Sequence, residues 1–205
     1  MSAPAYSATA TEFSTPPAEP MGLVQAWFDS AVENAVQRPG TMALATANAC
    51  GHASNRMVAM LAARDTGLVF ATHAGSRKGR DLAETGWASG VLYWHEVGRQ
   101  VIVTGPTRPL PDAESDAIWA ARPVSTLPMS VATQQSAPLP DEDALRARAL
   151  ELSRAGSALP RPATWLGYLL KPASVEFWQT DPDHLYPRLR YERTDPGWRI
   201  DRLQP

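Results

Sequence analysis

Cysteine is almost absent from this chain of 205 residues, which contains only Cys50. A single thiol excludes an internal disulfide and a zinc site built from cysteines, and it suits a reducing cytoplasm, where we expect the protein to reside. No run of 18 apolar residues occurs, so we expect no membrane-spanning helix. The 19 basic and 21 acidic side chains give a net charge of −2, which argues against a protein that binds nucleic acid through its overall charge.

Several familiar motifs are also missing. The sequence has no G-x-G-x-x-G, no G-x-x-x-x-G-K-[ST], no H-E-x-x-H and no G-x-S-x-G, so dinucleotide-binding, P-loop, zincin and hydrolase-elbow interpretations have no support. None of the four histidines is followed within two to four residues by another metal-binding side chain, and we expect no metal site. These histidines are His52, His73, His95 and His184.

The chain divides into a short arm and one domain. Residues 1–20 mix alanine, serine, threonine and proline and contain no lysine or arginine, which does not fit a secretory or transit peptide. We expect them to form a flexible N-terminal arm. Residues 21–205 are long enough for a single domain with a substantial core.

Helices are predicted at a few places between longer strand-like segments. Apolar residues recur with helical spacing from Leu23 to Ala35, before a breaker cluster at Arg38-Pro39-Gly40. Residues 112–121 and 141–155 have helical composition with acidic residues near their starts. Ser76 is suited to cap a short helix that follows it.

The remaining segments predict antiparallel strands. Apolar runs alternate with turn residues, including Asp65-Thr66-Gly67 and Asp195-Pro196-Gly197. Six or more strands with few long helices predict a mainly β fold with peripheral helices, arranged as a closed or partly closed antiparallel barrel. The strand-like segments are residues 41–48, 54–65, 68–75, 87–96, 99–110, 165–179 and 189–205.

Two groups of cations stand out. Arg56 lies in a predicted strand beside Met57 and Val58, where burial of an unpaired charge is costly. It therefore has either a carboxylate partner on the next strand or an anionic ligand. The segment from Thr72 to Arg80 places arginine and lysine at a strand-to-helix junction, which is either a phosphate-binding helix start or a solvated basic turn.

A third candidate feature is aromatic. Trp178 ends a predicted strand, and Arg188 follows ten residues later on the next one. Together they could bracket a planar ring by stacking and hydrogen bonding. The alternative is a core tryptophan and an unrelated surface arginine.

In combination, these segments resemble the FMN-dependent pyridoxamine 5′-phosphate oxidase family over about residues 20–205. The resemblance implies a split barrel of antiparallel strands that works as a homodimer, with FMN bound across the interface. The segments that carry the resemblance are RMV (56–58), ATHAGSRKGR (71–80), RQVIV (99–103), QQS (134–136), VEFWQ (175–179), LRYER (189–193) and GWRIDRLQP (197–205).

The resemblance also implies a cofactor site. Its phosphate and ribityl tail would be surrounded by Arg56, Thr72, Arg77, Lys78, Gln135 and Ser136, with Met57, Val58 and Ala71 from the same segments. The isoalloxazine ring would contact Gln100, Trp178 and Arg188.

The substrate side departs from the members that oxidise vitamin B6. Where those members hold a substrate phosphate with Lys, Tyr, Arg and Ser, this chain has Leu61, Ile118, Arg122 and Thr126. Losing charge-assisted hydrogen bonds of about 1.5–3 kcal/mol each makes pyridoxine 5′-phosphate a poor fit. The family's R-L-H-x-R segment is represented here by residues 184–188, with His184 and Tyr186 in place of its first arginine and its histidine.

A branch of the family that oxidises partly reduced phenazine carboxylic acids resembles this chain more closely. The segments that carry this second resemblance are THAGSRKGRDL (72–82), WASGVLYW (87–94) and ARPVSTLPMS (121–130). It implies hydride transfer from a hexahydro-, tetrahydro- or dihydrophenazine ring to flavin N5, with O2 as final acceptor and H2O2 as product.

The hypothesis assigns roles to three residues. Arg122 pairs with a substrate carboxylate, and His184 or Tyr186 orients the ring or accepts a proton. Two alternatives stay open: a pyridoxine/pyridoxamine 5′-phosphate oxidase with an altered pocket, and a split-barrel protein that binds flavin without catalysis.

Overall fold

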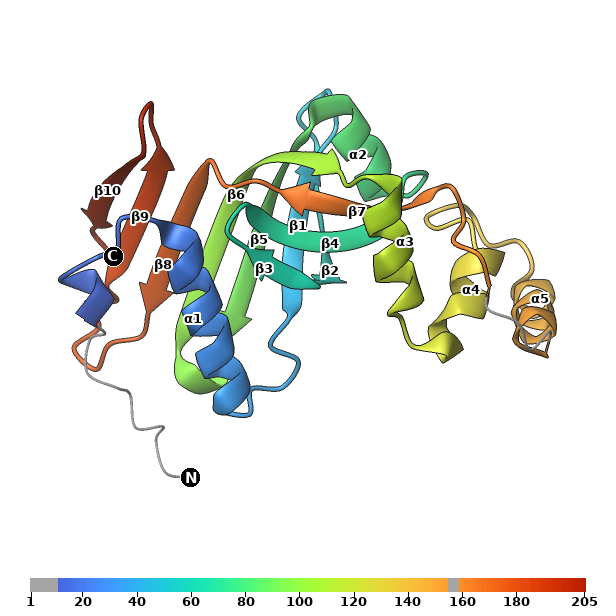
Figure 1. Ribbon diagram of the computed structural model, residues 1–205, viewed down its shortest axis with the longest axis horizontal. Helices are drawn as coiled ribbons and strands as arrows, with labels where there is room; N and C mark the ends of the chain where they lie inside the picture. Colours follow the sequence, from blue (N-terminus) through green and yellow to red (C-terminus); the bar gives the residue numbers. More distant parts are fainter. Residues whose placement is uncertain (1–10, 155–158) are drawn as a thin grey trace.

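The computed structural model describes residues 11–154 and 159–205 (Figure 1). Within these residues the chain forms a large antiparallel sheet with helices on its periphery, so the predicted fold class is confirmed. The strands are β1 (Thr41–Ala47), β2 (Ala53–Ala59), β3 (Ala62–Arg64), β4 (Gly67–His73), β5 (Trp87–Trp94), β6 (Arg99–Pro109), β7 (Trp165–Leu170), β8 (Ser174–Gln179), β9 (Arg188–Arg193) and β10 (Trp198–Leu203). The α-helices are α1 (Pro20–Glu33), α2 (Arg77–Thr85), α3 (Asp112–Ala120), α4 (Leu127–Ala132) and α5 (Glu142–Arg154).

The sheet runs in the order β10-β9-β8-β6-β5-β1-β2, and every pairing in it is antiparallel. The long strand β6 also pairs with β7 near its end, and β7 pairs with β4, which in turn pairs with β3. These pairings bring β3, β4 and β7 across the inner face of the main sheet (Figure 1). The core lies between the main sheet, the strands β3, β4 and β7, and the helix α1.

Strand periodicity explains the core. Alternate residues of β1, such as Met42 and Leu44, are fully buried, whereas Ala43 between them is partly exposed. The same alternation in β8 buries Phe177 and leaves Trp178 on the outer face. The sheet therefore has an apolar inner face and an outer face that keeps partly exposed side chains.

The predicted helices occur close to their expected positions. The first begins at Pro20, a residue favoured in the first helical turn, and ends at Glu33. Ser76 caps α2 as expected, because its hydroxyl accepts a hydrogen bond from the Gly79 main-chain nitrogen at 3.2 Å. The predicted turns at 65–67 and 195–197 connect β3 to β4 and β9 to β10.

Of the predicted N-terminal arm, residues 1–20, the structure describes residues 11–20; residues 1–10 lie outside the described part. Phe13 is 2% exposed, and its ring lies 6.0 Å from that of Trp27. Its carbonyl accepts a hydrogen bond from Arg202 at 2.7 Å, and the Arg202 guanidinium lies over the Phe13 ring. The buried ring of Phe13 holds this segment against the domain, together with hydrogen bonds such as that from the Tyr191 hydroxyl to the Pro17 carbonyl at 2.9 Å, although its composition is that of a linker.

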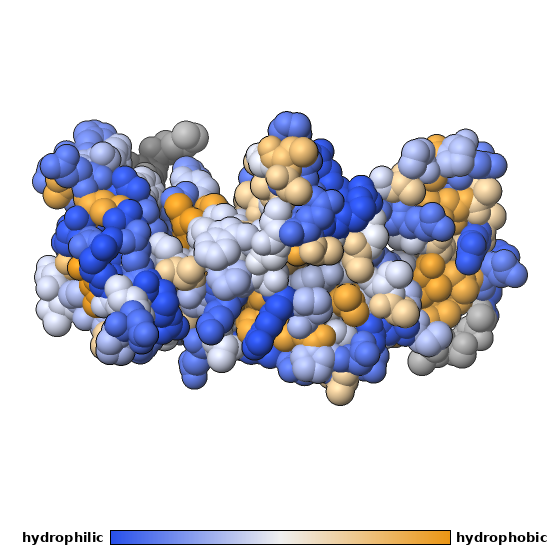
Figure 2. Space-filling view, turned by 90° about the horizontal axis from the view of Figure 1, so that it is seen from above, coloured by the Kyte–Doolittle hydropathy of each residue, from blue (hydrophilic) through white to orange (hydrophobic). Residues whose placement is uncertain are grey.

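The lobe formed by α4 and α5 stands apart from the sheet. Seen from above, it is separated by a hollow from the centre of the molecule, and apolar surface gathers on it (Figure 2). Val124, Leu139 and Leu150 are 77%, 55% and 50% exposed in this part of the chain. Among the described residues, no helix is long and apolar enough to cross a membrane.

Candidate functional site

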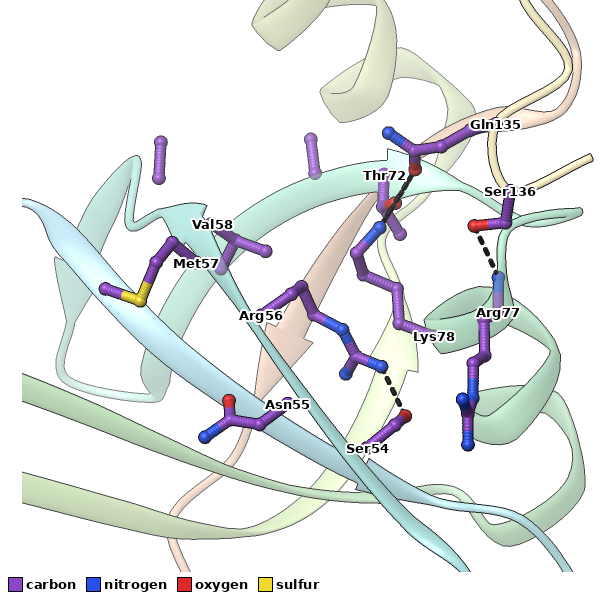
Figure 3. A pocket seen from close by; sticks show the side chains of 12 residues that line it. Ser54, Asn55, Arg56, Met57, Val58, Thr72, Arg77, Lys78, Gln135 and Ser136 are labelled. Carbon is purple, nitrogen blue, oxygen red and sulfur yellow. Dashed lines mark hydrogen bonds between the residues drawn. The ribbon is translucent and has the colours of Figure 1, made fainter. Parts of the chain in front are cut away.

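A polar cavity of about 530 Å³ lies between β2, β4, the start of α2 and the loop that follows α4 (Figure 3). It brings together every residue that the family resemblance assigned to a cofactor phosphate and its ribityl tail. The lining residues are Ser54, Asn55, Arg56, Met57, Val58, Ala59, Ala71, Thr72, Arg77, Lys78, Gln135 and Ser136.

The start of α2 sets the position of this cavity. A Cβ atom at Gly79 would lie 2.3 Å from the Ala74 carbonyl oxygen and 2.5 Å from that of His73. Only glycine therefore lets the first turn of α2 pack this closely against the end of β4. The close approach brings Lys78 to within hydrogen-bonding distance of Thr72 on β4.

Lys78 is a cation buried without a carboxylate. The residue is 8% exposed, and its amine donates to Thr72 Oγ1 at 3.0 Å and to Gln135 Oε1 at 2.9 Å. No acidic side chain in residues 11–154 or 159–205 forms an ion pair with it. Burial and the nearby charge of Arg56 lower the pKa of Lys78 to about 8. An anion in the cavity would compensate this buried charge.

Arg56 approaches the cavity from β2 (Figure 3). Its guanidinium donates to the Leu44 carbonyl at 3.0 Å, to Thr46 Oγ1 at 2.8 Å and to Ser54 Oγ. Asp81 lies behind these groups and accepts from the Thr46 and Ser54 hydroxyls at 2.6 and 3.1 Å. Burial lowers the pKa of Arg56, and Asp81 opposes this effect. The sequence left open a carboxylate partner for Arg56 on the next strand. The carboxylate found near Arg56 is that of Asp81 on α2, which is linked to the guanidinium through the hydroxyls of Thr46 and Ser54.

The cavity has the charge and the donors that a phosphate dianion requires. Arg56, Arg77 and Lys78 bring three cations, against one nearby carboxylate, Asp81. The Arg77 main-chain N–H at the start of α2 faces the cavity edge, where it donates to Ser136 Oγ at 3.2 Å. Cations, hydroxyls and a helix start arranged in this way fit the phosphate group of a mononucleotide.

A second cavity of about 350 Å³ adjoins the first. The two share Ala59, Ala71, Thr72 and Gln135, so a ligand in one lies next to a ligand in the other. We call this second cavity the substrate recess; its other lining residues are Leu61, His73, Arg122, Met129, Ser130, Thr133 and Trp165.

Two of the four predicted substrate positions line this recess. Leu61 is 46% exposed there, and Arg122 brings the guanidinium. Ile118 is instead partly buried and packs against the core, where its Cδ1 lies 3.0 Å from the position of a Cβ at Gly167. Thr126 is exposed, and its hydroxyl donates to the Pro123 carbonyl at 2.8 Å. The substrate roles of these four residues stay predictions.

Sequence reasoning missed six lining residues of the recess, and two of them, His73 and Ser130, contact its polar groups. His73, which lies opposite Trp165 across β4 and β7, is 7% exposed. Burial and the charges of Arg122 and Lys78 lower its pKa, while a hydrogen bond to the Ser130 backbone opposes them. Ser130 on α4 contacts Arg122 directly. Both residues lie in segments that carry the family resemblance, residues 71–80 and 121–130, and this was the signal that could have identified them.

The residues predicted for the isoalloxazine ring form a row on the outer face of the sheet. Gln100 on β6 pairs in register with Trp178 on β8, which pairs with Arg188 on β9. The row lines a cleft of about 210 Å³. The Arg188 guanidinium also forms an ion pair with Glu176 at 2.7 Å.

His184 and Tyr186 lie at the end of this row. Nδ1 of His184 and the Tyr186 hydroxyl are 2.7 Å apart, and the Tyr186 ring stacks on Trp178 at 5.5 Å and 25°. Both residues have positive φ values, 60° and 48°, which cost free energy in residues with a side chain. The ring contacts and the hydrogen bond stabilise this conformation.

Within one chain, the row and the phosphate cavity are separate. They share no lining residue, and β5 and β1 lie between β6 and β2 in the sheet. The structure therefore gathers the predicted cofactor residues into two groups, one on each side of these central strands.

Known proteins are similar to this chain over nearly its whole length, including the segments that form the phosphate cavity and the row. The family model described as pyridoxamine 5′-phosphate oxidase matches residues 28–154, and the model described as the pyridoxine 5′-phosphate oxidase C-terminal dimerisation region matches residues 165–205. The chain belongs to the pyridoxamine 5′-phosphate oxidase family. A pyridoxamine 5′-phosphate oxidase-related, FMN-binding protein from Nostoc punctiforme, at 18% identity and a TM-score of 0.73, shares the fold.

Two kinds of relative are similar over nearly the whole chain. The dihydrophenazinedicarboxylate synthase of Burkholderia lata is 46% identical over 95% of this chain and 92% of its own length. The pyridoxine/pyridoxamine 5′-phosphate oxidase of Paraburkholderia phymatum is 40% identical over 98% of this chain and 95% of its own. The crystal structure of PhzG from Burkholderia lata, in complex with tetrahydrophenazine-1-carboxylic acid, has a TM-score of 0.96 and 45% identity, covering 98% of this chain and 99% of that one.

Proposed function

We propose that the protein is an FMN-dependent oxidase of phenazine biosynthesis that oxidises partly reduced phenazine carboxylic acids. The observation that carries this proposal is the substrate recess, in which Arg122 is the cation and Leu61 and Trp165 add apolar surface. A flat apolar ring system with a carboxylate suits such a recess better than a small phosphate ester does. The similarity to the dihydrophenazinedicarboxylate synthase and to PhzG supports the same substrate class.

FMN is the proposed cofactor, with its phosphate among Arg56, Arg77 and Lys78 and its tail near Gln135 and Ser136. When bound, FMN supplies a hydride acceptor that O2 reoxidises with formation of H2O2. The protein contributes binding and orientation, because the electron chemistry belongs to the cofactor.

A homodimer completes this site in the proposal. The ring row Gln100, Trp178 and Arg188 and the phosphate cavity lie in separate places on one chain. A second copy that packs against the outer face of the sheet could bring its row to the phosphate cavity of the first. The match of residues 165–205 to a dimerisation region supports this arrangement.

The chain's own residues then hold the substrate. Arg122 binds the carboxylate, and Leu61 gives the ring an apolar contact that also disfavours a charged phosphate. His184 and Tyr186 of the second copy orient the ring. In the tautomer in which Nδ1–H of His184 donates to the Tyr186 oxygen, Nε2 is the nitrogen that would take up a substrate proton.

Anaerobic mixing of the FMN-loaded protein with tetrahydrophenazine-1-carboxylic acid tests the proposal. We expect the flavin absorption to bleach and then to recover in air with release of H2O2. Pyridoxine 5′-phosphate, mixed in the same way, should leave the absorption unchanged on that time scale. Bleaching by pyridoxine 5′-phosphate alone would identify a vitamin B6 oxidase with an altered pocket, and no bleaching by either compound would identify a non-catalytic flavin-binding protein.

A further inference from the structure

Arg122 is held in a fixed orientation by two aromatic rings. Its guanidinium carbon lies 4.9 Å from the ring centroid of Trp119 and 5.2 Å from that of Trp165. The two indoles meet edge to face, 5.0 Å apart and at 71°, and both are almost fully buried. This contact fixes the side of the guanidinium that faces the core.

The hydroxyl of Ser130 makes the polar contact to the same group. Ser130 Oγ accepts a hydrogen bond from Arg122 Nη2 at 2.9 Å and donates one to the Thr126 carbonyl at 3.0 Å. A serine hydroxyl has a single proton, and Ser130 uses it in the hydrogen bond to the Thr126 carbonyl. The oxygen lone pairs are therefore directed at the guanidinium, and the helix α4 sets their position.

The backbone of Ser130 is itself held from the opposite wall of the recess. The ring of His73 lies near the Ser130 main chain, which acts to raise the pKa of this histidine, and Nδ1 of His73 lies 3.4 Å from Thr164 Oγ1. These contacts link α4 to the end of β4 and to the segment before β7. Ser130 is thus supported from both sides rather than placed on a loose surface turn.

Arg122 differs in its charge environment from Arg161 and Arg188. Arg161 pairs with Asp112 and Asp116, and Arg188 pairs with Glu176. In the part of the chain that the structure describes, no carboxylate pairs with Arg122, and its Nη1 is buried without a hydrogen-bond partner. The guanidinium is thus oriented by neutral groups and keeps its charge for a ligand.

We propose that Ser130 is a positioning residue that determines specificity for carboxylates, because it orients the Arg122 guanidinium toward the carboxylate of a planar aromatic substrate. This inference rests on the proposed function. Family resemblance pointed instead to Thr126 for a polar contact, but the Thr126 hydroxyl is engaged with the Pro123 carbonyl. One turn later on α4, Ser130 makes the contact to Arg122 that Thr126 does not make.

The test compares two probes that do not react with the FMN-loaded protein. Phenazine-1-carboxylate carries the charge, and phenazine-1-carboxamide has the same rings without it. Calorimetric titration should show that the wild type prefers the carboxylate by tenfold or more. Ser130→Ala should weaken carboxylate binding about tenfold and carboxamide binding less than about twofold. Ser130→Thr, which keeps the hydroxyl, should restore carboxylate affinity, and Ser125→Ala, at an exposed serine of the preceding turn, should match the wild type.

Steady-state kinetics with tetrahydrophenazine-1-carboxylic acid should likewise show an effect on substrate binding and none on the chemical step. In Ser130→Ala, KM should rise while kcat stays close to the wild-type value. Unchanged carboxylate affinity in Ser130→Ala would overturn the inference, and so would an equal loss for both probes, which indicates a merely structural role. If wild-type flavin does not bleach but the probe preferences hold, the proposed function fails and the role of Ser130 stands.

Discussion

Burial, together with the guanidinium of Arg56 on β2, lowers the pKa of the Lys78 amine on α2 to about 8. A bound phosphate dianion favours the charged amine and raises this pKa again, so binding above pH 8 takes up a proton. We expect the affinity for FMN to fall as the pH rises above about 8, by up to about tenfold per pH unit. Calorimetric titrations between about pH 7 and pH 9 measure the slope of the FMN affinity against pH. In Lys78→Arg, whose side chain stays charged, the slope should disappear, and its persistence would contradict the assignment to Lys78.

Replacing the buried amine separates binding from stability. Lys78→Met should weaken FMN binding by tenfold or more, because a charge-assisted contact to the phosphate is lost. The free energy of unfolding of the protein without cofactor should change by less than about 1 kcal/mol, since a buried charge without a carboxylate partner contributes little to stability. Lys171→Met, at an exposed lysine, is the matched control for both measurements. A large loss of stability with unchanged affinity would refute the phosphate role.

Mixed dimers test whether the cofactor site is shared between two copies. Lys78→Met alters the phosphate cavity, and Trp178→Ala alters the ring row. Each variant alone should bind FMN weakly. After coexpression, about a quarter of all sites should regain wild-type affinity, because each hybrid dimer contains one intact site. Hybrid dimers that form, as seen by native mass spectrometry, yet recover no FMN binding would exclude a shared site.

Gly79 makes the close contact between α2 and β4. In Gly79→Ala the new Cβ would meet the His73 and Ala74 carbonyl oxygens, so we expect a loss of about 2–3 kcal/mol in the free energy of unfolding, together with weaker FMN binding. Gly22→Ala in α1 has nothing within 4 Å of its new methyl and should instead gain about 0.5–1 kcal/mol from helix propensity. Chemical denaturation measures the free energy of unfolding of both variants. Equal changes in the two variants would show that the close contact at Gly79 does not require glycine.

Arg122 should control substrate affinity. Arg122→Ala should raise KM for a reduced phenazine carboxylic acid by tenfold or more, because the carboxylate loses its cation. Arg148→Ala, at an exposed position on α5, is the control for loss of an arginine elsewhere. Steady-state rates of H2O2 formation provide the measurement. A KM equal to that of the wild type would remove Arg122 from substrate binding.

Much of the fold could be predicted because its signals are local. The alternation that buries Met42 and Leu44 on one face of β1 is visible in the sequence, and so are the turns that join β3 to β4 and β9 to β10. The short helix α4 could not be predicted in this way. It has only six residues, too few to show a helical period, and it follows Pro123 and a 3₁₀ turn. The burial of Phe13 could not be predicted either, because this residue lies in a segment whose composition is that of a linker.

The candidate site was predictable only in part, because much of it depends on contacts between distant segments. Arg56 could be suspected as a strand cation, but the support from Asp81 through hydroxyl groups crosses from a strand to a helix. Ile118 matches a substrate position in the family, yet the rotation of α3 directs it at Gly167, where the missing side chain leaves room for it. Matching positions in a sequence do not determine where a side chain points.

Titration of the cofactor-free protein with FMN and with riboflavin tests the central claim most directly. The two ligands share the ring system and differ in the phosphate that Arg56, Arg77 and Lys78 are proposed to bind. We predict one FMN per chain and an affinity for riboflavin that is at least about a hundredfold weaker. Equal affinity for the two ligands, or no binding of FMN, would contradict the account.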